Sequence, residues 1–173
     1  MTSPAELQNQ SEPASGQEGL TTPTVSFVTK AFASGLFSGF SPAASGTVGS
    51  AVALALYFIP GFELPYVLLP LCALVFLFGV RASDAMEKVY GHDPAEVTID
   101  EVLGMWISLL FLPKSLLVAG LAFFIFRILD IIKPFPARRL DNTKGGLGIM
   151  LDDVVSGVYS NLALQLLVAT RIL

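Results

Sequence analysis

Long apolar runs separated by short polar breaks restrict the fold of this chain more than any other feature. They occupy residues 25–59, 64–80, 102–112, 116–132 and 154–169. A helix needs about 20 apolar residues to cross a bilayer, and several of these runs are shorter. Only 14% of the 173 residues are charged, against about 25% in a typical soluble domain. The pattern therefore predicts an all-α integral membrane bundle.

The first 24 residues differ in composition from the rest of the chain. They are rich in Ser, Pro, Gln and Glu and have no apolar periodicity, which is typical of disordered segments. They lack the basic start and apolar core of a secretory signal. We expect a disordered tail at residues 1–24 and a single membrane-embedded domain at residues 25–173.

The connections between the runs indicate the topology. A Gly/Ser/Pro-rich segment at residues 38–46 interrupts the first run and predicts a re-entrant or interfacial half-helix. Such irregular backbone is tolerated at membrane depth only where protein buries it or a wet cavity adjoins it. Basic residues alternate between the connections, with four of them at positions 133, 138, 139 and 144. Because basic loops stay in the cytoplasm, we expect four to five membrane helices with the N-terminus inside.

Acidic residues gather on the predicted cytoplasmic side, at or near helix ends. A pathway for ions would distribute ionisable groups over several depths of the membrane. A one-sided cluster favours an enzyme site instead, with a small transporter or cation channel as the alternative. The carboxylates concerned are Asp84, Asp93, Asp100, Glu101, Asp130, Asp152 and Asp153.

Asp100 and Glu101 open the third run, directly before a wholly apolar stretch. One acid at a helix start is explained by the helix dipole. A second adjacent acid, with Gly104 one turn further on, favours a metal site that the backbone can approach closely. We predict that both carboxylates bind metal or take part in catalysis.

Arg127 and Asp130 lie inside an apolar run, and their i, i+3 spacing places them on one helix face. They could form an ion pair that only stabilises the helix. Ionisable groups in such a run cost about 2.5–3.5 kcal/mol each on insertion scales, however, and usually face a polar interior. Lys133 follows before Pro134 ends the helix. We predict that Arg127 and Lys133 bind phosphate.

Asp152 and Asp153 begin the last run, after a glycine-rich segment at residues 144–150. Glycines allow backbone N–H groups to approach a ligand closely. The segment is not a Walker loop, because no Gly-Lys-Ser/Thr follows. Together with the paired aspartates, it predicts part of a metal and phosphate site.

Three further side chains carry weaker predictions. Asp84 has Arg81 at i−3 and Lys88 at i+4, so a solvated, ion-paired helix face competes with a role as metal ligand. His92 is the sole histidine, and loop histidines are often inert. Cys72 is the sole cysteine, lies in an apolar run and is best explained as a small buried hydrophobe.

The chemistry of these residues points to magnesium. Carboxylate oxygens without clusters of His or Cys suit Mg²⁺, which binds through a few carboxylates and substrate phosphate. Arginine and lysine nearby would neutralise phosphate oxygens. The chain has no Cys-x5-Arg motif, no Asp-x-Asp-x-Thr loop and no second histidine. If it hydrolyses phosphate, metal and carboxylates must carry the reaction. No basic patch with interleaved aromatic residues suggests nucleic acid.

Five sequence blocks are similar to motifs of a known family. They are Gly-Phe-Ser-Pro at 39–42, Ser-Gly-Thr-Val-Gly-Ser at 45–50, Asp-Glu-Val-Leu-Gly-Met-Trp-Ile at 100–107, Phe-Arg-Ile-Leu-Asp-Ile-Ile-Lys-Pro-Phe-Pro at 126–136, and Gly-Gly-Leu-Gly-Ile-Met-Leu-Asp-Asp-Val-Val-Ser-Gly at 145–157. From about residue 32 onward, the chain resembles the phosphatidylglycerophosphatase A family. Residues 44–46, Ala-Ser-Gly, lack the proline expected before the glycine.

The resemblance implies Mg²⁺-dependent hydrolysis of phosphatidylglycerophosphate to phosphatidylglycerol, at a cytoplasmic site in the bacterial inner membrane. A transferase that uses a prenyl diphosphate would share the metal and the acids, but it would release diphosphate. By position, the resemblance implies a metal set of Asp84, Asp100, Glu101, Asp130 and Asp153, and a catalytic set of Asp100, Glu101, Asp130, Asp152 and Asp153. The implied phosphate or headgroup contacts are Arg127, Lys133, Ser41, Thr47 and Ser50.

Overall fold

The computed structural model describes residues 24–171, which contain helices and no strand. The tail predicted at residues 1–24 lies outside this range except for Thr24. The order of elements confirms the predicted all-α class for the described residues. The helices are α1 (Phe27–Ala33), the 3-10 turn η1 (Ser38–Phe40), α2 (Ser45–Tyr57), α3 (Pro65–Tyr90), α4 (Ile99–Leu109), α5 (Leu116–Ile132), α6 (Ala137–Asp141) and α7 (Gly146–Ala169).

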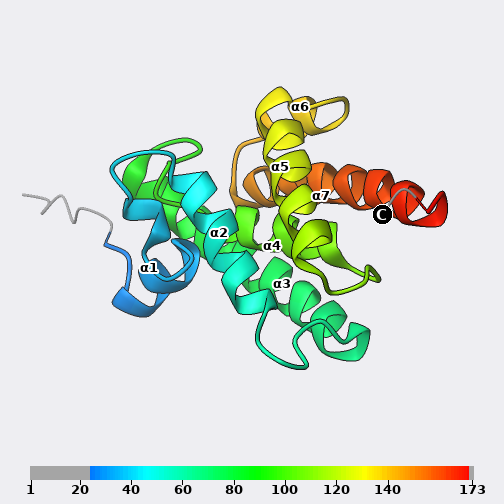
Figure 1. Ribbon diagram of the computed structural model, residues 1–173. Coiled ribbons are helices and arrows are strands. Elements are labelled where there is room, and N and C mark those ends of the chain that lie inside the picture. Colours follow the sequence, from blue (N-terminus) through cyan, green and yellow to red (C-terminus); the bar gives the residue numbers. More distant parts are fainter. Residues whose placement is uncertain (1–23, 172–173) are drawn as a thin grey trace, which may run out of the picture.

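Helix α4 lies at the centre of the bundle, and α2, α3, α5 and α7 pack around it (Figure 1). Nearly all of its side chains are buried, from Ile99 to Leu109. The contact with α7 is close because both helices present glycine there. A side chain at Gly157 would collide with the backbone of Gly104. Small residues at such crossings let two backbones approach each other.

Two other contacts fix the neighbours of α4. The indole of Trp106 donates a hydrogen bond of 3.0 Å to the carbonyl of Ala53 in α2. At the far end of α4, the side-chain amide of Asn161 in α7 donates to the carbonyl of Leu110 at 2.8 Å. These bonds satisfy polar groups that would otherwise be buried without partners.

Helix bounds agree with the apolar pattern for α5 and differ for α7. Helix α5 covers Leu116–Ile132, the predicted run. Helix α7 begins at Gly146, eight residues before the apolar run, so the glycine-rich segment starts a helix instead of forming a ligand-binding loop. Gly146 and Gly148 lie against backbone carbonyls of Val80 and Thr143, where a side chain would not fit. Helix packing therefore accounts for both glycines.

Among the described residues, two helices are long and apolar enough to cross a membrane, α3 and α7. The prediction of four to five such helices is not met. Helices α2, α4 and α5 contain 13, 11 and 17 residues, or about 20, 17 and 26 Å at 1.5 Å per residue. A bilayer core is about 30 Å thick. The apolar runs in these three helices are therefore too short to cross it, although their composition suggested crossings.

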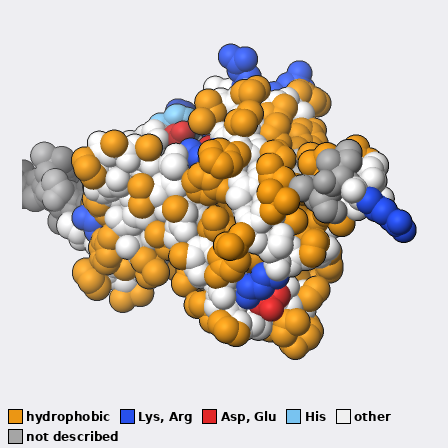
Figure 2. Space-filling model, viewed as in Figure 1, with side chains coloured by type: hydrophobic (Ala, Val, Ile, Leu, Met, Phe, Trp, Pro, Cys, Tyr) orange, Lys and Arg blue, Asp and Glu red, His pale blue; other side chains and the backbone are white. Residues whose placement is uncertain are grey.

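The surface carries many exposed apolar side chains. Figure 2 shows them spread over most of one face, with few charged groups between them. They include Phe27, Tyr66, Leu116, Phe124 and Ile131, each more than half exposed. Exposed apolar area of this extent marks a surface that meets a membrane or a partner.

Candidate active site

A polar pocket of about 420 Å³ lies where α2 and α4 begin and α5 ends, beside the second turn of α7. Its walls come from four separate stretches of the chain, within residues 44–46, 93–101, 127–133 and 152–153, so only the tertiary structure assembles it. The lining residues are Ala44, Ser45, Gly46, Asp93, Pro94, Ala95, Val97, Asp100, Glu101, Arg127, Asp130, Ile131, Lys133, Asp152 and Asp153.

Five carboxylates from three helices meet in this pocket, and they form two overlapping groups. Carboxylate oxygens of Asp100, Glu101 and Asp153 lie within 4.8 Å of one another, and so do those of Asp130, Asp152 and Asp153. Asp153 belongs to both groups and is 2% exposed. The structure thus brings together all five residues of the predicted catalytic set.

Several oxygens of these carboxylates have no hydrogen-bond partner, although protein surrounds them. They are Oδ1 of Asp100, Oε2 of Glu101, Oδ1 of Asp152 and Oδ2 of Asp153. Burying a charged oxygen without a partner is strongly unfavourable. A divalent cation between the two groups would satisfy these oxygens, and carboxylates alone are the donors that Mg²⁺ prefers. The residues therefore fit the predicted metal.

Arg127 and Lys133 supply positive charge beside the acids. Arg127 Nη1 lies 2.9 Å from Asp130 Oδ2 and 3.9 Å from Glu101 Oε1. This agrees with the helix face predicted from the i, i+3 spacing. Its Nε and Nη1 are buried without a hydrogen-bond partner, so the guanidinium has unsatisfied donors beside the pocket.

Lys133 Nζ forms ion pairs with Asp152 and with Asp141, the latter at 2.6 Å. Burial lowers the pKa of this amine, but the hydrogen bonds to the two carboxylates outweigh burial and raise its pKa above the ordinary value. Lys133 therefore stays charged and holds Asp152 in place. Its backbone adopts the left-handed conformation that ends α5.

Hydrogen bonds from the segment before α2 position the pocket rim. The backbone N–H of Thr98 donates to the carbonyl of Ala33 at 3.0 Å, and the hydroxyls of Thr98 and Ser38 are 2.9 Å apart. Gly39 lies so close to the carbonyl of Glu96 that a side chain would not fit. Thr98 directly precedes α4, so these contacts fix where Asp100 enters the pocket.

One predicted metal ligand lies elsewhere. Asp84 is in the last part of α3, which contributes no residue to the pocket lining. Its Oδ2 accepts a hydrogen bond of 2.7 Å from Lys88, four residues further along the helix. This is the ion-paired helix face that was the alternative for Asp84, and the geometry does not bring it together with the other carboxylates.

The three predicted hydroxyl contacts also lie outside the pocket lining. Ser41 Oγ donates to the carbonyl of Ala43, and Ser50 Oγ donates to the carbonyl of Gly46, both at 2.9 Å. Thr47 is half-buried on α2. Helix α2 instead meets the pocket through its first turn, at Ser45 and Gly46.

Gly46 and Asp93 are pocket residues that the sequence prediction of site residues left out. A side chain at Gly46 would overlap Glu101 Oε1 and would lie 2.9 Å from Arg127 Nη2. A side chain there would displace the ends of the Glu101 and Arg127 side chains from their present positions. In the sequence, Gly46 could have been recognised only as a glycine at the start of an apolar helix. Several other glycines occupy similar positions, so this feature did not single it out.

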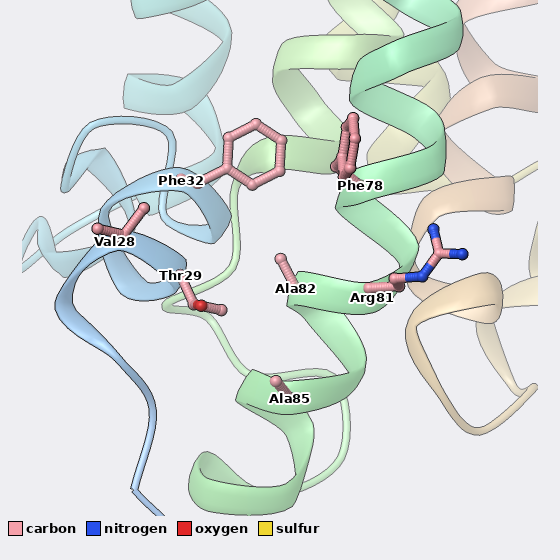
Figure 3. A pocket seen from close by; sticks show the side chains of 7 residues that line it. All are labelled: Val28, Thr29, Phe32, Phe78, Arg81, Ala82 and Ala85. Atoms are coloured by element: carbon pink, nitrogen blue, oxygen red, sulfur yellow. The ribbon is translucent and has the colours of Figure 1, made fainter.

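A second cavity, of about 510 Å³, lies between α1 and α3 and is mostly apolar (Figure 3). Phe32 and Phe78 face each other across its upper part, and the guanidinium of Arg81 points away from the other lining side chains. Arg81 donates to the carbonyl of Leu77 in its own helix. Without carboxylates or paired charges, this cavity has no group that could activate water.

Comparison with curated proteins identifies three relatives. A Bacteroides thetaiotaomicron protein with the provisional name phosphatidylinositol-3-phosphatase is 42% identical over 78% of this chain and 90% of its own length. The phosphatidylglycerophosphatase A of Escherichia coli is 42% identical over 73% of this chain and 75% of its own length. The corresponding Haemophilus influenzae protein is 34% identical over 73% and 80%.

No solved structure has significant similarity to the chain. Residues 31–168 match the phosphatidylglycerophosphatase A family. This range includes α2 to α6, most of α7 and every residue that lines the acidic pocket. The resemblance noted in the sequence blocks is thereby confirmed, and the chain belongs to the phosphatidylglycerophosphatase A family.

Proposed function

We propose that this chain is a Mg²⁺-dependent phosphatase that hydrolyses phosphatidylglycerophosphate to phosphatidylglycerol and inorganic phosphate. The observation that carries the proposal is the set of five converging carboxylates, four of which have buried oxygens without partners. Two of the relatives, at 42% and 34% identity, are phosphatidylglycerophosphatases A. We further propose that the protein is embedded in the bacterial inner membrane with this pocket facing the cytoplasm.

The candidate ligands for the ion are Asp100, Glu101, Asp130, Asp152 and Asp153. Bound there, Mg²⁺ would polarise the phosphoryl group and lower the pKa of a coordinated water molecule. Asp84 is left out of this set because it is paired with Lys88 on another helix face.

Side chains of the protein bind the phosphate, position Asp152 and transfer the proton. The guanidinium of Arg127 offers its free Nε–H to phosphate oxygens, which supplies charge-assisted hydrogen bonds. Lys133 holds Asp152 through its ion pair. A pocket carboxylate takes a proton from the attacking water as the new P–O bond forms. The ester P–O bond breaks, and the glycerol oxygen leaves with the proton that this carboxyl group returns.

The position of the pocket suits a lipid phosphate. It lies at the ends of apolar helices instead of midway along them, so a headgroup can enter while the acyl chains remain in the bilayer. A channel or transporter would need ionisable groups at several depths. The carboxylates of this pocket gather at one end of α4, α5 and α7.

Removal of the metal tests this proposal. Purified protein in detergent should release phosphate from phosphatidylglycerophosphate, and EDTA should reduce the rate by at least about 100-fold, as expected when a cation that stabilises the transition state is lost. Added Mg²⁺ should restore the rate. Activity that persists in EDTA would contradict the metal mechanism.

A parallel assay on phosphatidylinositol 3-phosphate separates two lipid substrates, because one relative carries that activity in its name. Both are phosphomonoesters on a phospholipid headgroup. We expect a higher kcat/KM for phosphatidylglycerophosphate. A higher kcat/KM for phosphatidylinositol 3-phosphate would support a lipid phosphatase with a different substrate.

A further inference from the structure

An apolar groove of about 390 Å³ lies between α2 and α5. Its lining contains no polar side chain and includes three small residues. Nothing lies within 4 Å of the position that a side chain at Gly120 would occupy. The two helices are therefore separated enough to leave space along their contact. The lining residues are Ala51, Leu54, Ala55, Phe58, Gly120 and Phe123.

The groove and the acidic pocket are lined by residues on one face of α5. Gly120 and Phe123 line the groove, whereas Arg127 and Ile131 line the pocket. Their spacing of i, i+3, i+7 and i+11 places all four on the same side of the helix. One continuous strip of α5 thus leads from the apolar space to the guanidinium that faces the carboxylates.

Helix α2 forms the opposite wall of both cavities, with the pocket at its start and the groove along its later turns. Its first turn lines the pocket at Gly46, and its later turns line the groove from Ala51 to Phe58. At 1.5 Å per residue, Ala51 is about 8 Å and Phe58 about 18 Å from Gly46 along the helix axis. One leaflet of the hydrocarbon core is about 15 Å deep, half of about 30 Å. The groove therefore extends over about 10 Å along α2, and its far end lies about as far from the pocket as one leaflet is deep.

The other two apolar cavities are less suited to this role. One lies between α1 and α3, and the other is lined by residues of α3, α4 and α7, including Ala73. Helix α3 takes part in both but contributes nothing to the acidic pocket. Between α4 and α7, the contact of Gly104 with Gly157 closes the way to the carboxylates.

We propose that the groove between α2 and α5 binds one acyl chain of the phospholipid substrate while the terminal phosphate occupies the acidic pocket. This inference rests on the proposed function. The headgroup separates the reacting phosphate from the acyl chains, and the first turn of α2 separates the pocket from the groove. Apolar burial in the groove would hold the lipid with its phosphate at the carboxylates.

Filling the groove tests the inference. Ala55 is exposed at the groove, and Ala55→Phe would place a ring in the space of the chain. We expect kcat/KM on a dipalmitoyl substrate to fall by at least about tenfold, the scale of a misfit in an apolar pocket. On the same headgroup without acyl chains, kcat/KM should stay within about twofold. Gly120→Leu fills the groove from α5 and should give the same selective loss.

The matched control is Ala73→Phe, which adds the same ring to the groove beside α3 and should leave both substrates within about twofold of wild type. An equal loss on both substrates, no loss, or the same selective loss in the control would each overturn the inference. Failure of the wild-type protein to hydrolyse the lipid would instead overturn the proposed function on which it rests.

Discussion

Replacing Asp153 with Asn is expected to abolish phosphate release, because Asp153 is the carboxylate that both candidate ligand groups share. Its side chain is 2% exposed, and its Oδ2 has no protein partner. Changing a residue that only orients a metal ligand costs about 10–100-fold. Loss of a direct ligand should therefore exceed about 100-fold. The measurement is phosphate release at saturating Mg²⁺.

The same substitution should have the opposite effect on stability without metal. Five carboxylates close together repel one another when no cation is present. Asn keeps the shape of Asp153 and removes one charge, so Asp153→Asn should melt at a higher temperature than wild type in EDTA. Mg²⁺ should stabilise the wild type by about 2.7 kcal/mol at 100 times its Kd, and the variant by less. Equal Mg²⁺-dependent shifts in Tm would contradict the metal assignment.

Asp84→Asn is the matched control, because it makes the same chemical change outside the pocket. The Asp84–Lys88 pair is largely exposed, and such pairs contribute about 0–1 kcal/mol. Activity and the Mg²⁺-dependent shift in Tm should stay close to those of wild type. A loss as large as that of Asp153→Asn would show that the ion lies elsewhere than in the pocket.

The second large effect is expected from a single added methyl group, in Gly46→Ala. The new carbon would overlap Glu101 Oε1 and press on the Arg127 guanidinium. Buried groups in a packed site have little room to shift, and a misplacement of about 1 Å can cost about 100-fold in rate. We expect a loss of that size in kcat/KM, with the helical circular dichroism spectrum unchanged.

A second substitution identifies the cause of this loss. Glu101→Asp shortens the carboxylate by one methylene and makes room for the methyl at position 46. The double variant should therefore be more active than Gly46→Ala alone, which is a coupling between two residues in contact. Val48→Ala, on an exposed part of the same helix, should stay within about twofold of wild type. Without any rescue, steric conflict with Glu101 would not be the cause.

Local pattern was sufficient for much of this site. The i, i+3 spacing of Arg127 and Asp130 placed both on one face of α5, as predicted, and there they form the ion pair that was the alternative interpretation. The unusual position of Arg127 inside an apolar run indicated a polar interior, because such a residue is unfavourable in any other surroundings. The adjacent acids at residues 100–101 and 152–153 were selected for another reason: each pair stands at the start of an apolar run, next to glycines.

Other parts depended on contacts that no local pattern contains. Ser41, Thr47 and Ser50 have suitable chemistry, but α2 presents its first turn, with Gly46, to the pocket. The glycine-rich segment before Asp152 resembled a ligand loop, although its glycines are explained by close packing of α7 on α3 and on residue 143. Helix α4 is apolar but only 11 residues long, so a count of apolar runs did not yield the number of helices that can cross a membrane.

The sequence by itself determined the helical class, the family and the five carboxylates that meet in the pocket, because apolar periodicity, the ordered motifs and the positions of the charged residues follow from the chain alone. Only the tertiary structure decided that Asp153 is shared by two groups of acids and that Gly46 must have no side chain. Both are facts about distances between helices that are far apart in the chain. Such distances result from packing the whole bundle, so they cannot be inferred from the sequence of any single segment.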